Sequence, residues 1–119
     1  MAIKGMHPIL NTSDLPALLA YLREKAGFEV AWTVDAEGGE PVYAGLTCEG
    51  HELHAQPAES TPKGMQLYFE VDDADDAYQA LKEKGAEPSE PENQSYHMRD
   101  FSVTGPEGTI IGFGAQIPE

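Results

Sequence analysis

The sequence has few of the residues that several classes of protein require. Cys48 is the single cysteine among 119 residues, which excludes a disulfide scaffold and a cysteine-based zinc site. Seven basic residues stand against 21 acidic ones, so binding of nucleic acid is disfavoured, because clustered Lys and Arg bind a phosphate backbone. No hydrophobic run approaches the ~18 residues of a membrane helix, and no apolar leader opens the chain. We therefore expect a cytoplasmic protein that contacts neither nucleic acid nor membrane.

The chain has enough hydrophobic residues to form one core, and it carries a strong negative charge. Hydrophobic residues make up 40% and aromatic residues 8% of the sequence, and the length suits a single domain over 1–119. The net charge of -14 would raise the local concentration of a cationic ligand. An acidic surface that only keeps the protein in solution is the alternative interpretation.

A hydrophobic pattern typical of a helix occurs twice. In each case a stripe of apolar residues has the i, i+3, i+4, i+7 spacing of an amphipathic helix, and an acidic residue that can cap the helix precedes the stripe. The spacing predicts one helix over 14–26, stopped by Gly27, and a second that ends near Gly85. The second stripe lies 59 positions after the first, and the two consist of Leu15, Leu18, Leu19 and Leu22, and of Ala74, Ala77, Tyr78 and Leu81.

Strand-like segments surround each helix in the same order. In the first half they cover 6–10, 28–34, 42–47 and 51–55, and in the second half 65–71, 87–92, 97–104 and 109–115. Both halves read βαβββ. The sequence therefore predicts an α+β fold of two βαβββ modules, 3–56 and 65–117, joined by a connector at 57–64 that is rich in Pro, Ser and Thr. We expect a curled mixed sheet around a cleft, with the helices on its outer face.

Strand alternation predicts which side chains line the cleft. Leu67, Phe69 and Val71 must face a core, and Leu53 does the same in the first half, so their polar neighbours face the other way. A concave, polar face of this kind is a ligand site by default. The predicted lining consists of His7, Glu52, His54, Gln66, Tyr68, Glu70 and Gly112.

Several of these segments resemble one known group of proteins. They are His7 with Asp14-Leu15, then 26–30, then 67–73, and finally the stretch 96–108, which contains Met98-Arg99-Asp100-Phe101 and the turn at 105–108. Together they are similar to the vicinal oxygen chelate superfamily, which includes glyoxalase I, bleomycin-resistance proteins, fosfomycin-resistance proteins and extradiol dioxygenases. The resemblance covers nearly the whole chain and is closest to the bleomycin-resistance-like members.

The resemblance implies where a metal would be held. Metal-dependent members carry ligands on the first and fourth strands of each module, which here places His7 and Gln66 on the first strands. Glu52, or His54 if the register slips by two, and Gly112 are on the fourth strands. His7 and Glu52 are good ligands, whereas Gln66 is weak and Gly112 offers no side chain. We therefore expect no metal cofactor, with a divalent ion such as zinc, nickel or iron on His7, Glu52 and Gln66 as the alternative.

The function that the resemblance implies is binding without chemistry. Bleomycin-resistance-like members sequester a drug as homodimers with clefts between the subunits, so we expect a binder of a small molecule, such as a cationic drug or antibiotic, and not an enzyme. Stacking would come from Trp32, Tyr43, Tyr68 and Tyr96, and charge from Glu52, Glu70 and Asp100.

Other interpretations remain open at this stage. Trp32, Tyr43 and Tyr96 could pack in the core or at a dimer contact, and the two histidines could be hydrogen-bonded without a metal. Arg99 shares strand parity with Phe101 and suits a structural ion pair. A metal-dependent lyase or isomerase of glyoxalase type is the alternative function, and a module that acts through its dimer face or a partner protein is another.

Overall fold

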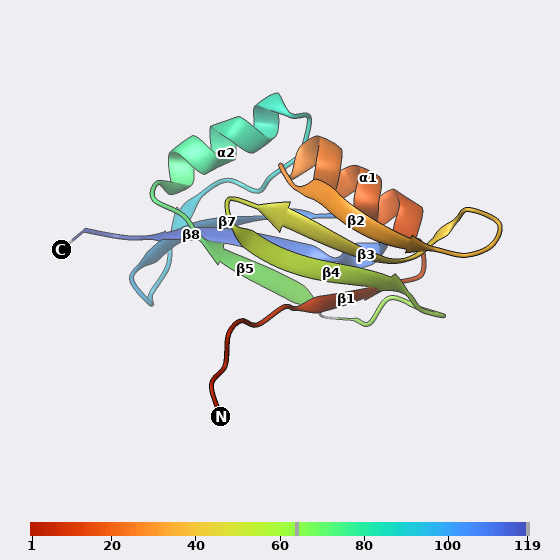
Figure 1. Ribbon diagram of the computed structural model, residues 1–119. Helices are drawn as coiled ribbons and strands as arrows, with labels where there is room; N and C mark the ends of the chain where they lie inside the picture. Colours follow the sequence, from red (N-terminus) through yellow and green to blue (C-terminus); the bar gives the residue numbers. More distant parts are fainter. Residues whose placement is uncertain (64, 119) are drawn as a thin grey trace. The chain divides into compact units, whose positions relative to one another are not determined.

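The computed structural model describes residues 1–63 and 65–118, which group into two compact units. Unit one is Met1–Pro62 and unit two is Lys63–Glu119, so the division falls inside the predicted connector. Each unit has one helix and one four-stranded mixed sheet that is open at its edges (Figure 1). The predicted α+β class with two βαβββ modules is therefore confirmed.

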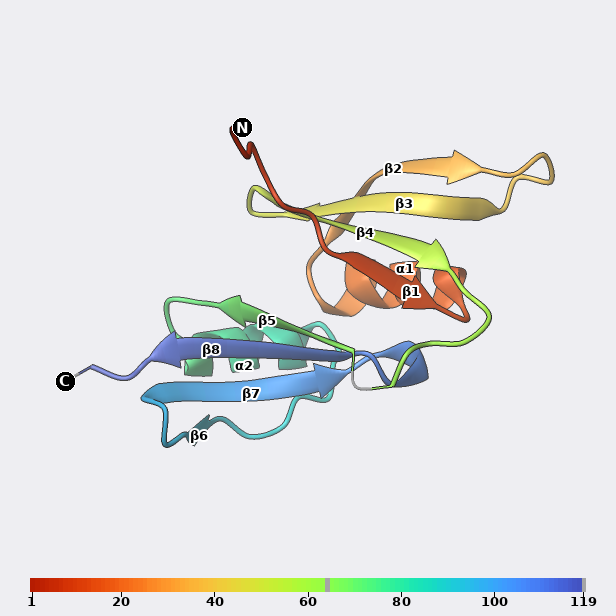
Figure 2. The same ribbon diagram turned by 90° about the horizontal axis from the view of Figure 1, so that it is seen from below.

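The sheet of unit one has the strand order β1-β4-β3-β2 (Figure 2). β1 runs parallel to β4, and the other two pairs are antiparallel. Helix α1 covers one face of this sheet. The elements are β1 (Ile9–Thr12), α1 (Leu15–Lys25), β2 (Glu29–Asp35), β3 (Pro41–Cys48) and β4 (His51–Pro57).

The sheet of unit two has the matching order β5-β8-β7-β6 (Figure 2). β5 is parallel to β8, and β7 is antiparallel to both of its neighbours. Helix α2 lies against β7 and β8. The elements are β5 (Gln66–Glu70), α2 (Ala74–Glu83), β6 (Glu92–Asn93), β7 (Met98–Thr104), a short 3-10 turn η1 (Pro106–Gly108) and β8 (Ile110–Gln116).

Both helices begin and end where the local sequence predicts. The side chain of Asp14 accepts a hydrogen bond from the Ala17 backbone N–H at 3.1 Å, and that of Asp73 accepts one from Asp76 at 3.0 Å. Gly27 and Gly85 follow the two helices with positive φ angles of 81° and 91°. Neither helix in the described part of the chain is long and apolar enough to cross a bilayer.

Each helix packs its apolar stripe on one face of its own sheet. In unit one all four leucines of the predicted stripe are buried, together with Leu46 and Leu53 from the strands. In unit two Leu81 of α2 is buried, and so are Phe101 of β7 and Ile111 of β8, the two strands that α2 packs against. Burial of each such side chain contributes about 1.5–3 kcal/mol, so this face holds each unit together. The opposite face of each sheet is left for polar and aromatic side chains.

Two predicted strands differ from the structure by more than two residues at one end. The strand predicted over 87–92 is wrong except at its end, because only Glu92–Asn93 pairs with β7. Pro88 and Pro91 have no N–H for a strand ladder, so the chain crosses this region as a loop. The first strand begins at Ile9 and not at residue 6, so His7 precedes it.

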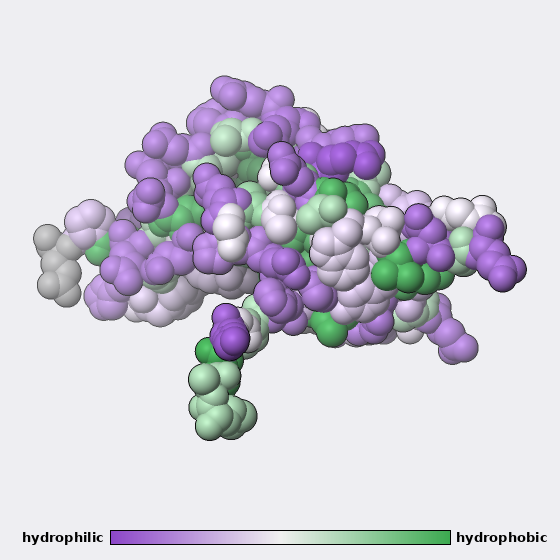
Figure 3. All heavy atoms as spheres, viewed as in Figure 1, coloured by the Kyte–Doolittle hydropathy of each residue, from purple (hydrophilic) through white to green (hydrophobic). Residues whose placement is uncertain are grey.

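The segment that carries His7 still runs alongside β4, because the Pro8 carbonyl accepts a hydrogen bond from the His54 backbone N–H at 2.8 Å. Residues before it are exposed, and Met1, Ile3 and Met6 expose more than four-fifths of their surface. Figure 3 shows hydrophobic atoms in this segment and beside the β2–β3 hairpin, within a surface that is otherwise mostly hydrophilic.

Candidate functional site

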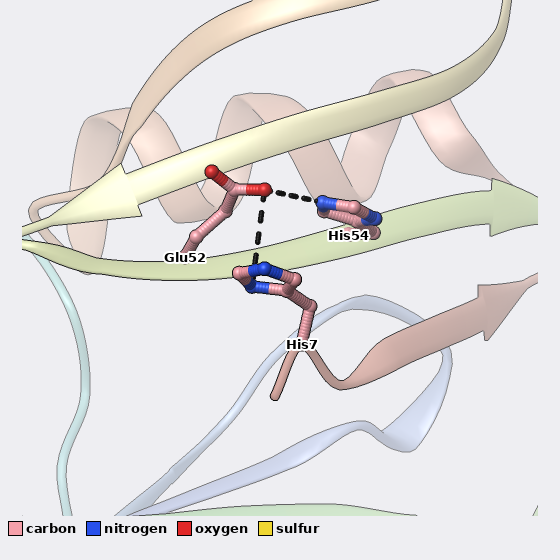
Figure 4. A group of neighbouring side chains, drawn as sticks. All are labelled: His7, Glu52 and His54. Atoms are coloured by element: carbon pink, nitrogen blue, oxygen red, sulfur yellow. Dashed lines mark hydrogen bonds and ion pairs between the residues drawn. The ribbon is translucent and has the colours of Figure 1, made fainter. Parts of the chain in front are cut away.

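Three potential metal ligands come together in unit one on the sheet face turned away from α1 (Figure 4). Glu52 and His54 flank the buried Leu53 on β4, so strand alternation places both on this face, as predicted. Glu52 Oε2 lies 2.6 Å from His54 Nε2 and 3.8 Å from His7 Nδ1. One ligand atom from each of the three residues lies within 4.8 Å of the others.

Hydrogen bonds hold the ring of His54 from both sides. The bond from His54 is the main cause that lowers the pKa of Glu52, against the effect of burial, and the charges of His7 and His54 add to it. An ionised Glu52 can only accept, so His54 Nε2 donates to it. On the other side of the ring, Nδ1 lies 3.0 Å from the Tyr43 hydroxyl, which can donate to it when the ring is neutral. The two hydrogen bonds therefore fix the orientation of the His54 ring.

An aromatic surface extends from this cluster across β3 to β2. The Trp32 ring lies nearly parallel to that of Tyr43, with centroids 5.8 Å apart, and both meet His54 edge-on. His7 stacks on His54 with a centroid distance of 5.2 Å. Trp32 is 40% exposed, so it is neither a core residue nor shielded from a ligand. Unit one thus presents a continuous aromatic surface that ends at the Glu52 carboxylate.

The three ligands of unit one fit a divalent transition metal. Two imidazoles and one carboxylate are a donor set that zinc, nickel and iron accept. A metal-binding histidine normally engages its second ring nitrogen with a fixed partner, and Tyr43 provides one for His54. The structure groups His54 with His7 and Glu52, whereas Gln66, the third ligand expected from the sequence, lines a cavity of unit two.

That cavity has a volume of about 530 Å³ on the open face of the β5–β8 sheet and is formed within unit two. Four residues predicted for the site line it: Gln66, Tyr68, Tyr96 and Gly112. Asp100, predicted as a source of charge, lines it too. Its other wall was not predicted, because 87–92 was expected as a strand. This wall consists of Ser89, Glu90, Glu92 and, just after that segment, Gln94. Phe101, Ser102 and Ile110 complete the lining.

Asp100 organises one wall of the cavity. Its Oδ2 accepts hydrogen bonds from the hydroxyls of Tyr68 at 3.0 Å and Tyr96 at 2.6 Å, and its Oδ1 accepts one from Gln94 Nε2 at 3.0 Å. Burial and then the bond to Asp100 raise the pKa of Tyr68 to about 12, and the bond to Asp100 is the main cause that raises the pKa of Tyr96. Both phenols therefore stay neutral and remain donors at physiological pH.

The lining of this cavity is acidic and aromatic. Three carboxylates contribute to it, from Glu90, Glu92 and Asp100, and the described part of the chain supplies no Lys, Arg or His side chain to it. Tyr68 and Tyr96 are 51% and 58% exposed, so their rings are accessible to a ligand. A group with positive charge and an extended π-system complements such a wall.

Two further residues lie outside this lining. Glu70 Oε1 is 3.4 Å from Gln116 Nε2, which can donate to it. Arg99 donates to both carboxylate oxygens of Asp75, at the start of α2, with Nε–O distances of 3.3 and 3.1 Å. The interpretation of Arg99 as part of a structural ion pair is confirmed.

Strand register shows which positions of the two modules correspond. Ile9 pairs with His54, and Tyr68, 59 positions after Ile9, pairs with Gly112. Gly112 is therefore the counterpart of His54. Gln66 pairs with Ile110, which makes Ile110 the counterpart of Glu52. Glycine and isoleucine offer no ligand atom, so the metal-ligand set of unit one has no equivalent at these positions of unit two.

Comparison with solved structures identifies the same fold in several bacterial proteins. A glyoxalase-related enzyme from Clostridium phytofermentans is 19% identical with a TM-score of 0.86, and covers 98% of each chain. The bleomycin-binding protein of Streptomyces verticillus, complexed with copper(II)-bleomycin, is 21% identical with a TM-score of 0.77, over 100% of this chain and 99% of the other. An antibiotic-binding protein from Streptomyces sp. CB03234 is 20% identical with a TM-score of 0.73, over 98% of both chains.

Sequence comparison gives the family directly. No curated protein matches the chain. The sequence model of the glyoxalase/bleomycin resistance protein/dioxygenase superfamily, however, matches residues 6–113, which is nearly the whole chain. The two βαβββ modules and the fold of the solved structures agree with that match. The chain therefore belongs to the glyoxalase/bleomycin resistance protein/dioxygenase superfamily.

Proposed function

We propose that this protein binds a small, planar, cationic molecule and sequesters it without chemical change. The observation that carries the proposal is the composition of the cavity in unit two. Its wall combines three carboxylates with two accessible phenol rings. These groups complement positive charge and a flat π-system, and none of them is arranged as a nucleophile beside a base.

The three carboxylates of the cavity have different functions. The two Tyr hydroxyls and Gln94 already satisfy Asp100, which is only 9% exposed, so it keeps the rings in place. Glu90, just before β6, and Glu92, in β6, also line the cavity, and both are exposed, so they are the groups that would face a ligand cation. The net charge of -14 would steer that cation toward the protein.

The comparisons support binding as the type of function. One solved structure with this fold is named for bleomycin binding and contains copper(II)-bleomycin, and another is named as an antibiotic-binding protein. Sequestration of an antibiotic by this chain would make it a resistance protein. A homodimer with clefts between subunits and a cytoplasmic location remain predictions from the sequence.

Calorimetric titration of the chelator-treated protein with ethidium, a planar aromatic cation, and with copper(II)-bleomycin tests the proposal. We expect saturable binding of ethidium with no product formed, and copper(II)-bleomycin tests a larger ligand. The double variant Glu90→Gln/Glu92→Gln should bind ethidium more weakly than the control Glu24→Gln/Glu83→Gln, which removes the same charge from the two helices. Equal ethidium affinities of the two variants, or no binding of ethidium by the unmodified protein, would contradict the proposal.

A second candidate function is that of a metal-dependent lyase or isomerase of glyoxalase type, and the cluster of His7, Glu52 and His54 favours it. A divalent metal held there would act as a Lewis acid on an oxygen of the substrate. With the metal in place of the proton on Nε2, the ring of His54 would carry its proton on Nδ1 and donate it to the Tyr43 hydroxyl, which would keep the ring oriented. Elemental analysis and titration with zinc, nickel and iron(II) test this candidate. It predicts one metal per chain and loss of that metal in His54→Ala, whereas absence of binding excludes it.

A further inference from the structure

We infer that Gly45 is a positioning residue: the missing side chain on β3 gives the Trp32 ring its place and so forms the aromatic surface of unit one. The inference depends on the proposed function only where it concerns ligand affinity. Gly45 has no side chain with which to touch a ligand and acts through the indole ring of Trp32.

The ring of Trp32 occupies the space of a side chain at Gly45. A Cβ placed on Gly45 would collide with the ring at Cε2 and would lie 2.5 Å from both Cζ2 and Nε1. Real Cβ atoms essentially never approach another heavy atom within 3.0 Å. The two residues are direct partners in the β2–β3 register, just after a register shift between Val30 and Trp32. Any residue other than glycine at this position must therefore move the ring.

The backbone gives no other reason for a glycine here. Gly45 is absent from the glycines with positive φ, so its backbone conformation is open to any residue. Glycine inside a strand costs roughly 0.5–1 kcal/mol relative to alanine. Its neighbours Ala44 and Leu46 point into the core and are fully buried, whereas Gly45 lies on the open face under the indole. Steric room for Trp32 is what this glycine provides.

The position of Trp32 decides the geometry of the surface around it. Its ring is nearly parallel to Tyr43, at an interplanar angle of 12°, and meets His54 at 75°. Tyr43 in turn binds His54 Nδ1 through its hydroxyl. A ring lifted from Gly45 would lose these contacts together. Trp32 is 40% exposed, and its indole would then no longer be held in one orientation for a flat ligand.

The same arrangement occurs in unit two with different residues. Tyr68 on β5 lies over two glycines of the adjacent strand β8. A Cβ on Gly112 would be 3.0 Å from Tyr68 Cδ2, and one on Gly114 would collide with the Tyr68 hydroxyl. Neither glycine has positive φ. In both units, then, an exposed aromatic side chain crosses onto a neighbouring strand where glycine leaves room for it.

The variant Gly45→Ala tests the inference, because Trp32 is the only tryptophan of the chain and its spectra report on one site. We expect a shifted fluorescence maximum, stronger quenching by acrylamide and loss of the near-ultraviolet dichroism of the indole, with a native far-ultraviolet spectrum. Gly5→Ala is the matched control, because the nearest atoms to its added methyl lie 3.7 Å away. Spectra of Gly45→Ala that match those of the control would overturn the inference.

A double-mutant cycle with Trp32→Ala separates positioning from a general effect on the fold. Without the ring, the added methyl meets no indole, so Gly45→Ala should destabilise the Trp32→Ala protein less than it destabilises the unmodified one. Equal destabilisation in both backgrounds would contradict the inference, and this comparison stays valid if Gly45→Ala alone folds poorly.

If ethidium binds at the aromatic surface, Gly45→Ala should weaken ethidium binding roughly three- to tenfold, the effect of one stacking contact. Failure of ethidium to bind at all would count against the proposed function and would leave the spectral test intact.

Discussion

Tyr68 reaches across a whole strand to Asp100: it starts on β5, passes over Gly114 of β8 and donates from its hydroxyl to Asp100 Oδ2 on β7 at 3.0 Å. The contact joins three of the four strands of unit two on their open face. It places an aromatic ring and a buried carboxylate in one wall of the cavity, which is the wall on which the proposed function depends.

Ionisation of Tyr68 should depend on Asp100. The pKa of Tyr68 is raised from its usual 10.0 to about 12 by burial and by Asp100, so the variant Asp100→Asn should lower it toward 10. Absorbance at 295 nm, recorded against pH and compared with Tyr68→Phe, measures the change. An unaltered titration in Asp100→Asn would show that the hydrogen bond is not formed in solution.

The same raised pKa predicts how stability responds to alkaline pH. The folded protein holds the Tyr68 proton more tightly than the unfolded chain, so its contribution is complete below pH 10 and is lost as pH rises toward 12. Urea unfolding at several pH values should show the free energy of unfolding falling over this range. The fall should be smaller in Tyr68→Phe. An equal fall in both proteins would assign the alkaline sensitivity to other groups.

Gly114→Ala should disrupt the contact between Tyr68 and Asp100 without a change in charge. Its methyl group would collide with the Tyr68 hydroxyl and lie 3.1 Å from Asp100 Cβ, so the phenol must leave Asp100. We expect a lowered Tyr68 pKa, as in Asp100→Asn, and weaker ethidium binding. If Gly114→Ala instead retains both the raised pKa and the affinity, the ring can tolerate the methyl group and the glycine is not required.

The ion pair between Arg99 and Asp75 should matter little for stability. Both side chains are substantially exposed, at 36% and 61%, and exposed pairs contribute about 0–1 kcal/mol. Arg99→Met should therefore change the free energy of unfolding by less than ~1 kcal/mol and should leave ethidium affinity unaltered, since Arg99 is outside the cavity lining. A large loss of affinity in this variant would place Arg99 in the binding machinery.

Electrostatic attraction predicts that binding of a cation weakens with salt. Raising the ionic strength from roughly 0.1 to 1 M shortens the Debye length from about 10 Å to 3 Å, which screens the acidic surface. Ethidium affinity should fall over this range, and its association rate should fall as well. Affinity that does not change with salt would attribute binding to stacking alone.

Local patterns in the sequence predicted the elements that local interactions determine. The leucine stripe with its Asp14 cap, and the repeated stripe after Asp73, gave both helices, because capping and burial act within one or two turns. Strand alternation placed Glu52 and His54 on one face for the same reason.

Long-range contacts could not be predicted in this way. The sequence left open whether Glu52 or His54 is the fourth-strand position that corresponds to Gly112, and only the register shows that it is His54. The loop that carries Glu90 and leads into β6 at Glu92 was missed because its prolines were included in a predicted strand. A local signal existed there, since two prolines three residues apart argue against a paired strand.

The most direct test of the binding account is a map of where a planar cation contacts the protein. Amide NMR spectra of the chelator-treated, ¹⁵N-labelled protein should be recorded during titration with ethidium. The account predicts saturable shifts in β5, in the segment 89–102 and near Gly112, which surround the cavity of unit two. Absence of shifts, or shifts that appear only after a metal has been added, would contradict it.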